Sequence, residues 1–256
     1  MKYQNNFWNR YFKYYDVLLK VIPYQELFTR ITASLQLAPT HKVLDLGAGT
    51  GNLQLFLPKN TEVISIDNSS EALERLKSKF PNATVIKHSI QEKLPFPDNT
   101  FDRVVSNNVL YTLHADEWDF VISEIKRISK PESIIVISNL NKDFNAINIY
   151  KDHIRKSLKQ KGLVKTIWQL TNLLYPTIKM IQFNKTINNN DDVGRYSFLT
   201  SDEQQLKFEK FGMISQQETE KVYSDQAFLN VFRNEKKTVE NKVEKELPKE
   251  QNHGVL

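Results

Sequence analysis

The stretch VLDLGAGTG at residues 43–51 decides how the rest of the chain is interpreted. The chain has seven glycines, and Gly47, Gly49 and Gly51 alternate within this stretch. An apolar run that leads into closely spaced glycines predicts a buried strand followed by a tight turn, because glycine adopts positive φ and lets a ligand approach the backbone. In open α/β sheets such a turn follows the first parallel strand, where nucleotides bind. The stretch therefore predicts a nucleotide-cofactor site.

Strand and helix patterns alternate on either side of this turn. Short apolar runs predict strands, and apolar positions three or four residues apart predict helices. The expected strands are 42–46, 62–67, 83–87, 103–106, 133–138, 213–221 and 227–233, and the expected helices between them are 52–57, 71–80, 116–129 and 201–211. This alternation predicts βαβ units and hence an α/β fold with a doubly wound, mostly parallel sheet.

Two further segments surround or interrupt this core. The first is rich in aromatic side chains at helical spacing, and the second is too apolar and too helical in pattern to be a loop. Beyond the last strand the sequence is rich in Lys and Glu with few apolar residues, which is typical of a disordered tail or a linker to another module. The expected organisation is an N-terminal helical cap at 1–38, a core at 39–140 and 197–233, a helical insertion at 141–196 interrupted at Pro176, and a charged tail at 234–256.

The composition excludes several classes of protein. The 256 residues include no cysteine, so disulfides, thiolate metal sites and cysteine nucleophiles are excluded, and no metal site is expected. The amino terminus has no apolar signal core and no apolar run reaches membrane-spanning length, so a cytoplasmic protein is expected. The formal charge of +5 is spread along the chain and does not require a nucleic-acid partner.

Three residues narrow the choice of nucleotide cofactor. Asn52 stands where the dinucleotide fingerprint requires a small residue. Asp67 ends the second expected strand about twenty residues after the first glycine, where a carboxylate accepts hydrogen bonds from ribose hydroxyls and repels a 2′-phosphate. Asp45, inside the glycine motif, is hard to reconcile with a pyrophosphate but suits a cofactor that carries a cationic amino-acid group. An NAD-dependent oxidoreductase is therefore disfavoured.

Four ordered motifs resemble those of one family. VLDLGAGTG at 43–51 resembles the first motif of class I S-adenosylmethionine-dependent methyltransferases, and VISIDNS at 63–69 resembles their second-strand acidic motif. LPFPDNTFD at 94–102 is similar to the stretch before their fourth strand, and SNNVL at 106–110 fits the position after it. FKYYDVL at 12–18 is similar to the entry segment of the ubiquinone/menaquinone C-methyltransferase branch.

The resemblance implies the fold, the cofactor and the residues that bind it. It implies a Rossmann-like methyltransferase fold with seven strands in the order 3-2-1-4-5-7-6, the seventh antiparallel, and S-adenosylmethionine as the cofactor. By position, Asp67 would bind the ribose hydroxyls. Ser89 stands where the family often has an acid for the adenine amino group, and a serine can still accept that hydrogen bond. The set expected by position is Asp45, Gly47, Ala48, Gly49, Gly51, Asp67, Asn68, Ser89, Ile90 and Asn107. Tyr15 joins this set from the aromatic N-terminal segment, which either covers the sheet edge or closes rings such as Tyr11 and Tyr15 over the cofactor or acceptor.

The methyl acceptor must be inferred from the N-terminal segment and the insertion. Both are apolar and aromatic, which favours transfer to an O, N or C nucleophile of a small or medium hydrophobic metabolite, such as a natural product, carboxylate, phenol or quinone-like molecule. A phenol or ring carbon is helped by a general base, and Tyr111 and His114 are the nearest candidates after the fourth strand. A carboxylate acceptor needs no base.

Other interpretations remain open at this point. One is a nucleic-acid methyltransferase, supported by the basic balance, and another is a methyltransferase-fold binding protein without catalysis. No Asn-Pro-Pro-Tyr signature follows the fourth strand, which speaks against DNA-adenine and protein-glutamine methyltransferases. A basic run near the start of the insertion is either a solvated helix face or attracts an anionic acceptor or a membrane surface. It consists of Lys151, Arg155, Lys156, Lys159 and Lys161.

Overall fold

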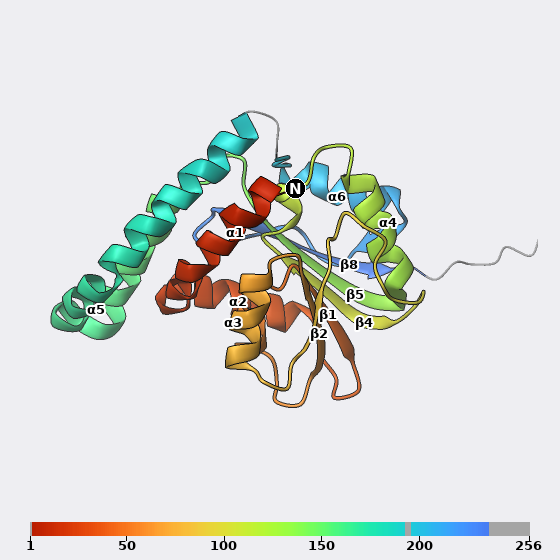
Figure 1. Ribbon diagram of the computed structural model, residues 1–256, viewed down its shortest axis with the longest axis horizontal. Helices are drawn as coiled ribbons and strands as arrows, with labels where there is room; N and C mark the ends of the chain where they lie inside the picture. The colour runs from red at the N-terminus through yellow and green to blue at the C-terminus, as the bar shows by residue number, and fades with distance from the viewer. Residues whose placement is uncertain (1, 193–195, 236–256) are drawn as a thin grey trace, which may run out of the picture.

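The computed structural model describes residues 2–192 and 196–235. They form one central sheet with helices on both of its faces (Figure 1). The strands are β1 Lys42–Leu46, β2 Glu62–Asp67, β3 Thr84–Lys87, β4 Phe101–Asn107, β5 Ser129–Leu140, β6 Met213–Ser215, β7 Glu220–Val222 and β8 Ala227–Asn234. The helices are α1 Lys2–Tyr15, α2 Ile22–Ser34, α3 Ser70–Lys79, α4 Trp118–Ile128, α5 Ala146–Asp192 and α6 Ser201–Lys210, with 3-10 turns η1 Asp16–Lys20, η2 Asn52–Leu55 and η3 Leu110–Thr112.

The sheet has the strand order β3-β2-β1-β4-β5-β8-β6, with β7 also paired to β8. Strands β1 to β5 pair in parallel, and β8 is antiparallel to β5. The α/β class and the doubly wound, mostly parallel arrangement predicted from the sequence are therefore confirmed. The strand expected at 213–221 differs, because it divides into β6 and β7, which pair with opposite ends of the eight-residue β8. Among the described residues the sheet thus has eight strands rather than seven.

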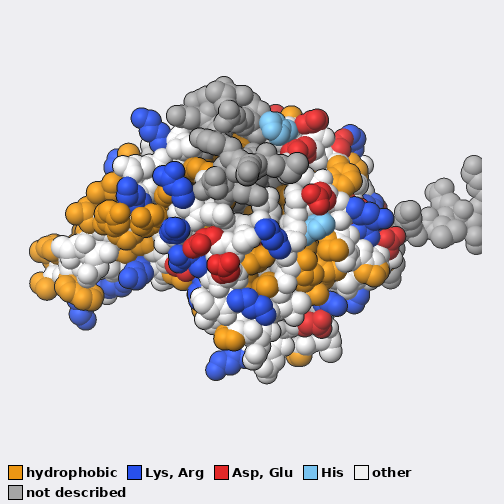
Figure 2. Space-filling view, in the orientation of Figure 1, with side chains coloured by type: hydrophobic (Ala, Val, Ile, Leu, Met, Phe, Trp, Pro, Cys, Tyr) orange, Lys and Arg blue, Asp and Glu red, His pale blue; other side chains and the backbone are white. Residues whose placement is uncertain are grey.

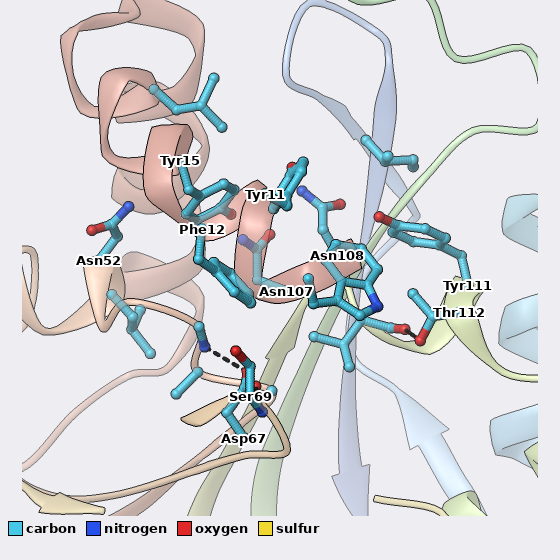
Figure 3. Close-up of a pocket in the computed structure, with 18 of the residues that line it drawn as sticks. Tyr11, Phe12, Tyr15, Asn52, Asp67, Ser69, Asn107, Asn108, Tyr111 and Thr112 are labelled. Atoms are coloured by element: carbon cyan, nitrogen blue, oxygen red, sulfur yellow. Dashed lines mark hydrogen bonds between the residues drawn. The ribbon is translucent and has the colours of Figure 1, made fainter. Parts of the chain in front are cut away.

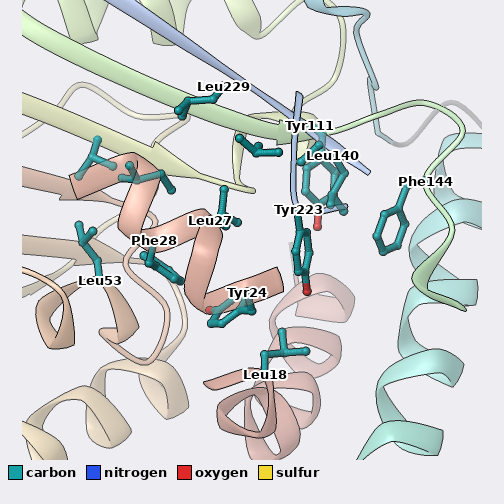
Figure 4. Close-up of a cluster of buried hydrophobic side chains, with 14 of the residues drawn as sticks. Leu18, Tyr24, Leu27, Phe28, Leu53, Tyr111, Leu140, Phe144, Tyr223 and Leu229 are labelled. Carbon is teal, nitrogen blue, oxygen red and sulfur yellow. The ribbon is translucent and has the colours of Figure 1, made fainter. Parts of the chain in front are cut away.

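The central strands carry apolar side chains to both faces of the sheet. Successive residues of a strand point to opposite sides, so Val43 and Leu44 of β1 enter different hydrophobic clusters. One cluster packs the sheet against α1, α2, α3 and α5, and part of it is drawn in Figure 4. The other packs the opposite face against α4 and α6, around the fully buried Trp118 and Phe208. Burial on both faces explains why the central strands carry successive apolar residues, such as Val43 and Leu44 in β1, Val104 and Val105 in β4, and residues 134–137 in β5.

The insertion after β5 is a helical hairpin that projects from the body of the molecule (Figure 1). The expected interruption at Pro176 was wrong, because the helix continues through that residue. The chain reverses instead at Gly162, whose φ of 76° and ψ of 173° are accessible essentially to glycine alone. The hydroxyls of Ser157 and Thr166, on the two arms, lie 3.1 Å apart beside this reversal. Proline removes a single N–H donor, and the buried Met180, just after Pro176, packs that arm into the hydrophobic cluster on the sheet.

The charged tail expected at 234–256 lies, from residue 236 onward, outside the described residues. Within the described ranges, no helix combines the length and the apolar character that crossing a bilayer requires.

Candidate cofactor and acceptor site

A cavity opens at the carboxyl ends of β1, β2 and β4 (Figure 3). Its empty space is about 1450 Å³, including the mouth that is open to solvent. We call one part of it the glycine-turn half, lined by Asp45, Gly47, Ala48, Gly49, Asp67, Asn68, Ser69, Ser89, Ile90 and Asn107. The other part, the aromatic half, is lined mainly by Trp8, Tyr11, Phe12, Tyr15, Tyr24, Tyr111, Ala146, Ile149, Tyr150, Met180 and Tyr223.

The glycine turn holds its shape through backbone hydrogen bonds and close packing. The N–H groups of Gly47 and Ala48 donate to the carbonyl oxygen of Ile66 on β2, at 2.9 and 2.8 Å. Gly47 has a φ of 78°, and a Cβ atom placed there would lie 2.3 Å from Cγ2 of Val109. Only glycine fits at this position. Any other residue would be strained by the positive φ, and its Cβ atom would clash with Val109.

Asp67 lies at the end of β2 with its carboxylate at the base of the turn. The N–H of Gly49 donates to its Oδ2 atom and the N–H of Ser69 to its Oδ1 atom, both at 2.8 Å. Burial raises the pKa of Asp67, and these backbone hydrogen bonds oppose that rise. Each carboxylate oxygen has a second lone-pair direction, so Asp67 can accept further hydrogen bonds from a ligand in the cavity.

Asp45 is a buried carboxylate with an unsatisfied oxygen. The residue is 4% exposed, and its Oδ2 atom has no hydrogen-bond partner among the described residues. Burial, and then the nearby Asp67 carboxylate, raise the pKa of Asp45 to about 7. An unpaired carboxylate is costly away from water, so this position favours a ligand that brings a positive charge or a hydrogen-bond donor.

The raised pKa of Asp45 predicts a pH-dependent difference between the wild type and Asp45→Asn. The folded protein binds this proton more tightly than the unfolded chain, so the stabilisation is complete at low pH and is lost as the pH rises toward 7. Relative to Asp45→Asn, the wild type should lose about 1 kcal/mol of unfolding free energy per pH unit between pH 5 and 7, and little more above that. Urea unfolding without ligand at each pH measures the difference. If the difference in unfolding free energy between the two proteins did not change with pH, the raised pKa of Asp45 would be contradicted.

The aromatic half is built from aromatic side chains of α1, α2, the connection between β4 and α4, and α5. Trp8, Tyr11 and Phe12 form successive edge and tilted contacts on α1, and Phe183 of α5 packs against Tyr11 at 5.7 Å between ring centroids. Burial raises the pKa of Tyr11 and Tyr15 well above the usual value. These phenols therefore stay protonated at neutral pH, and the aromatic half is apolar with hydroxyl groups that can donate hydrogen bonds.

The two residues expected as general-base candidates lie in different places. Tyr111 lines the cavity and is buried, and this burial, with Tyr196 nearby, raises the pKa of its hydroxyl. Tyr111 is thus placed to donate a hydrogen bond rather than to accept a proton. The side chain of His114 is exposed and does not line this cavity. The residue follows the 3-10 turn η3, and its backbone N–H donates to Oε2 of Glu117 at 2.8 Å.

The structure brings most of the expected cofactor residues together. Those that line the cavity are Tyr15, Asp45, Gly47, Ala48, Gly49, Asp67, Asn68, Ser89, Ile90 and Asn107. Gly51 does not line it; its φ is 76°, and it lies against Leu76 of α3, where a Cβ atom would come 2.5 Å from Cγ. Gly51 therefore supports the turn from behind.

Sequence reasoning missed Phe12 and Asn108 as cavity residues. Phe12 lies over the turn, with its Cε1 atom 3.0 Å from the position of a Cβ on Gly49. Its place in an aromatic-rich helix was a signal, but nothing in the spacing identified which ring would face the turn. Asn108 follows β4 with a φ of 56° and a buried Oδ1 atom without a partner among the described residues. That conformation points its amide into the cavity in Figure 3.

Comparisons with known proteins agree with this site. Residues 43–132 match the family described as "Methyltransferase domain". An uncharacterized methyltransferase of Synechocystis sp. is 31% identical over 140 residues, which are 54% of this chain and 64% of that protein. A ubiquinone/menaquinone biosynthesis C-methyltransferase of Burkholderia multivorans is 30% identical over 118 residues, 43% of this chain and 47% of that protein. The chain thus aligns with less than two thirds of the length of these curated relatives.

Solved structures show the same fold at low sequence identity. A SAM-dependent methyltransferase from Aquifex aeolicus has a TM-score of 0.53 at 18% identity, over 85% of this chain and 92% of that one. A complex between the Haloferax volcanii Trm112 methyltransferase activator and a methyltransferase gives a TM-score of 0.60 at 14% identity, over 90% of this chain and 98% of the matched one. The sheet order and the glycine turn define the class as a Rossmann-like methyltransferase fold.

Within that class, residues 43–132 match the methyltransferase-domain family, and the fold agrees with that of S-adenosylmethionine-dependent methyltransferases. S-adenosylmethionine is the cofactor of such domains. The residues present fit it, because the unpaired Oδ2 atom of Asp45 suits a cationic amino-acid group and the turn at Gly47 and Gly49 leaves no side chain in the way.

Proposed function

We propose that the protein transfers the methyl group of S-adenosylmethionine to an O, N or C nucleophile of a small or medium hydrophobic molecule. One observation carries this proposal. A single cavity joins the glycine turn and its two acids to a half lined by aromatic and aliphatic side chains from α1 and α5. Cofactor and acceptor can therefore meet within one cavity.

The glycine-turn half would hold the cofactor. Asp67 would accept hydrogen bonds from the ribose hydroxyls, and Asp45 would face the cationic amino-acid group. Ser89 and Ile90, just beyond β3, would border the adenine together with Asn68. The amino-acid end of the cofactor would then lie beside Asn107, whose Oδ1 atom is buried without a partner among the described residues.

The bound cofactor would supply an activated methyl group, so the chain itself has mainly to position the acceptor and exclude water. Correct orientation of two reactants can remove about 7–11 kcal/mol of a barrier. The rings of Tyr11, Tyr15 and Tyr111 close the aromatic half and keep their protons, so they can orient a polar group of the acceptor by donating hydrogen bonds. The acceptor's nucleophilic atom would then lie at the junction of the two halves.

The names of the relatives do not decide the acceptor. They include the C-methyltransferase of ubiquinone/menaquinone biosynthesis and a glycine/sarcosine/dimethylglycine N-methyltransferase from Actinopolyspora halophila, which is 27% identical over 117 residues. The second acts on small polar amines, whereas the aromatic half here is apolar. This contrast supports a hydrophobic acceptor.

Incubation with methyl-labelled S-adenosylmethionine and a panel of phenols, carboxylates and quinols tests the proposal. We expect labelled product with at least one apolar member of the panel. Binding of the cofactor without transfer to any apolar compound, but with transfer to polar amines or nucleic acid, would contradict the acceptor class. Failure to bind the cofactor would contradict the proposed function altogether.

A substitution in the aromatic half should weaken the binding of the acceptor without weakening the binding of the cofactor. Ala146 lines the aromatic half at the start of α5, so Ala146→Phe would fill acceptor space and leave the glycine turn untouched. We expect the KM for the acceptor to rise at least about tenfold and the Kd for S-adenosylmethionine to change less than about twofold. Ile147→Phe is the matched control, because Ile147 is adjacent but exposed and does not line the cavity. A parallel loss of cofactor affinity in Ala146→Phe would contradict the assignment of the aromatic half to the acceptor and the glycine-turn half to the cofactor.

A further inference from the structure

The distal part of the α5 hairpin carries a large exposed apolar patch. We define the hairpin patch as Leu163, Val164, Ile167, Trp168, Leu174 and Ile178. Val164 is 81% exposed and Trp168 is 72% exposed. In Figure 2 hydrophobic side chains gather on the projecting hairpin and are bordered by Lys and Arg side chains. Contiguous exposed apolar surface of this kind marks an interaction site.

The residues of the hairpin patch share one side of a helix and are not scattered over the surface. Thr166, Leu173, Met180 and Ile187 recur every seven residues and are buried, and Met180 and Ile187 belong to the cluster that packs on the sheet. The patch residues recur at spacings of four and seven on the other side of the same arm. A helix that is apolar on both sides buries one side within the molecule and leaves the second for a partner.

The charge around the patch is of one sign. Residues 153–190 contain no Asp or Glu. Arg155 and Lys156 are paired with Asp152, at 2.5 and 2.9 Å. The remaining basic residues of this stretch make no ion pair with any described residue, and they are Lys159, Lys161, Lys165, Lys179 and Lys185. A negatively charged partner would complement this surface.

We propose that the hairpin patch docks on the surface of a membrane that contains anionic lipids. Such a surface offers apolar acyl chains beneath negatively charged headgroups, which is the complement of an apolar face bordered by lysines. An exposed tryptophan such as Trp168 is well suited to the headgroup level. Each lysine near an anionic membrane contributes about 1 kcal/mol of attraction. The hairpin lies on the membrane in this arrangement and does not cross it.

Two other partners fit the surface less well. A second copy of the chain would bring identical patches together about a two-fold axis, and the unpaired lysines of both copies would then face one another. A nucleic acid would satisfy the lysines through its phosphates but would leave Leu163, Val164 and Ile167 facing water. An anionic lipid surface satisfies the charge and the apolar residues together.

The same hairpin links the docking surface to the cavity. Ile149 on its first arm and Met180 on its second line the aromatic half, while the patch lies toward the reversal at Gly162. A hydrophobic acceptor dissolved in the membrane would therefore lie close to the cavity when the hairpin is docked. This last step rests on the proposed function, whereas lipid binding itself does not.

Sedimentation with vesicles tests the proposal directly, using the full chain. We expect binding to phosphatidylcholine vesicles that contain phosphatidylglycerol, weakened by salt, and little binding to phosphatidylcholine alone. Val164→Ser/Trp168→Ser should lower the partition coefficient at least about tenfold, since burying each of these side chains contributes on the order of 1.5–3 kcal/mol. Leu206→Ser, at a residue of α6 that is 64% exposed, is the matched control and should bind as the wild type does. S-adenosylmethionine affinity should be equal in all three proteins, which separates this test from the proposed function.

Tryptophan fluorescence identifies the docking residue. Trp118 is buried and Trp8 is half-buried, so a blue shift on adding anionic vesicles should arise from Trp168 and disappear in Trp168→Phe. Several outcomes would overturn the proposal. They are no vesicle binding, equal binding to both kinds of vesicle, dimerisation that Val164→Ser/Trp168→Ser abolishes, or salt-sensitive binding to a DNA or RNA duplex that the same variant abolishes.

Discussion

Replacing Asp67 with alanine should weaken the binding of S-adenosylmethionine by at least about 100-fold, since each hydrogen bond to a charged group contributes about 1.5–3 kcal/mol and two ribose hydroxyls lose their acceptor. The variant also removes the acceptor for the N–H groups of Gly49 and Ser69, so the turn itself is loosened. Asp67→Asn keeps one acceptor oxygen and should bind about tenfold more weakly than the wild type.

Isothermal titration with the cofactor measures these losses. Asp98→Ala is a suitable control, because Asp98 is a surface carboxylate paired with Arg127 at 2.9 Å and does not line the cavity. Its affinity for the cofactor should equal that of the wild type. If Asp67→Ala also bound with unchanged affinity, the carboxylate at the end of β2 would not hold the ribose.

Gly47→Ala should destabilise the protein by about 2–5 kcal/mol and abolish measurable cofactor binding. Positive φ costs an L-residue about 1–2 kcal/mol, and forcing a methyl group into a packed site costs about 1–3 kcal/mol more. The new Cβ atom would lie 2.3 Å from Val109, so the turn must move away from β4 and lose the geometry that admits the ligand.

Two companion variants separate strain from contact. Gly212 has a φ of 72°, but a Cβ atom there would meet only the end of the Lys126 side chain at 2.9 Å. Gly212→Ala should therefore cost only the strain and leave cofactor affinity unchanged. Gly47→Ala/Val109→Ala should recover part of the lost stability, because it removes the two nearest atoms. Urea unfolding that ranked Gly47→Ala and Gly212→Ala equally would contradict the packing explanation.

The fold could be predicted because the local patterns and the global sheet agree. The glycine turn after β1, the acid at the end of β2 and the apolar runs of β4 and β5 are each dictated by nearby residues. The division of the expected strand 213–221 could not be predicted, because it depends on pairing with both ends of β8, which is distant in sequence. The reversal at Gly162 could have been predicted, since a glycine is a stronger candidate than a proline for a reversal between helices.

Site residues could be predicted where the residue type and its place at the end of a strand determine the role. They could not be predicted where the packing of distant segments determines which side chain reaches the cavity. Asp45 and Asp67 were chosen for the chemistry of a carboxylate at the end of a strand, and both line the cavity. His114 was chosen for proximity in sequence to β4, but its side chain is exposed beyond the 3-10 turn η3. Phe12 was missed because it reaches Gly49 through the docking of α1, which no local pattern encodes.

A structure of the protein bound to S-adenosylhomocysteine tests the central claim most directly. The proposed function predicts both ribose hydroxyls within about 3.2 Å of the Asp67 carboxylate. It also predicts the amino group beside Asp45 and the sulfur atom facing the ring of Tyr111 and the aromatic half. A ligand whose adenine occupied the aromatic half, or whose ribose made no contact with Asp67, would contradict it.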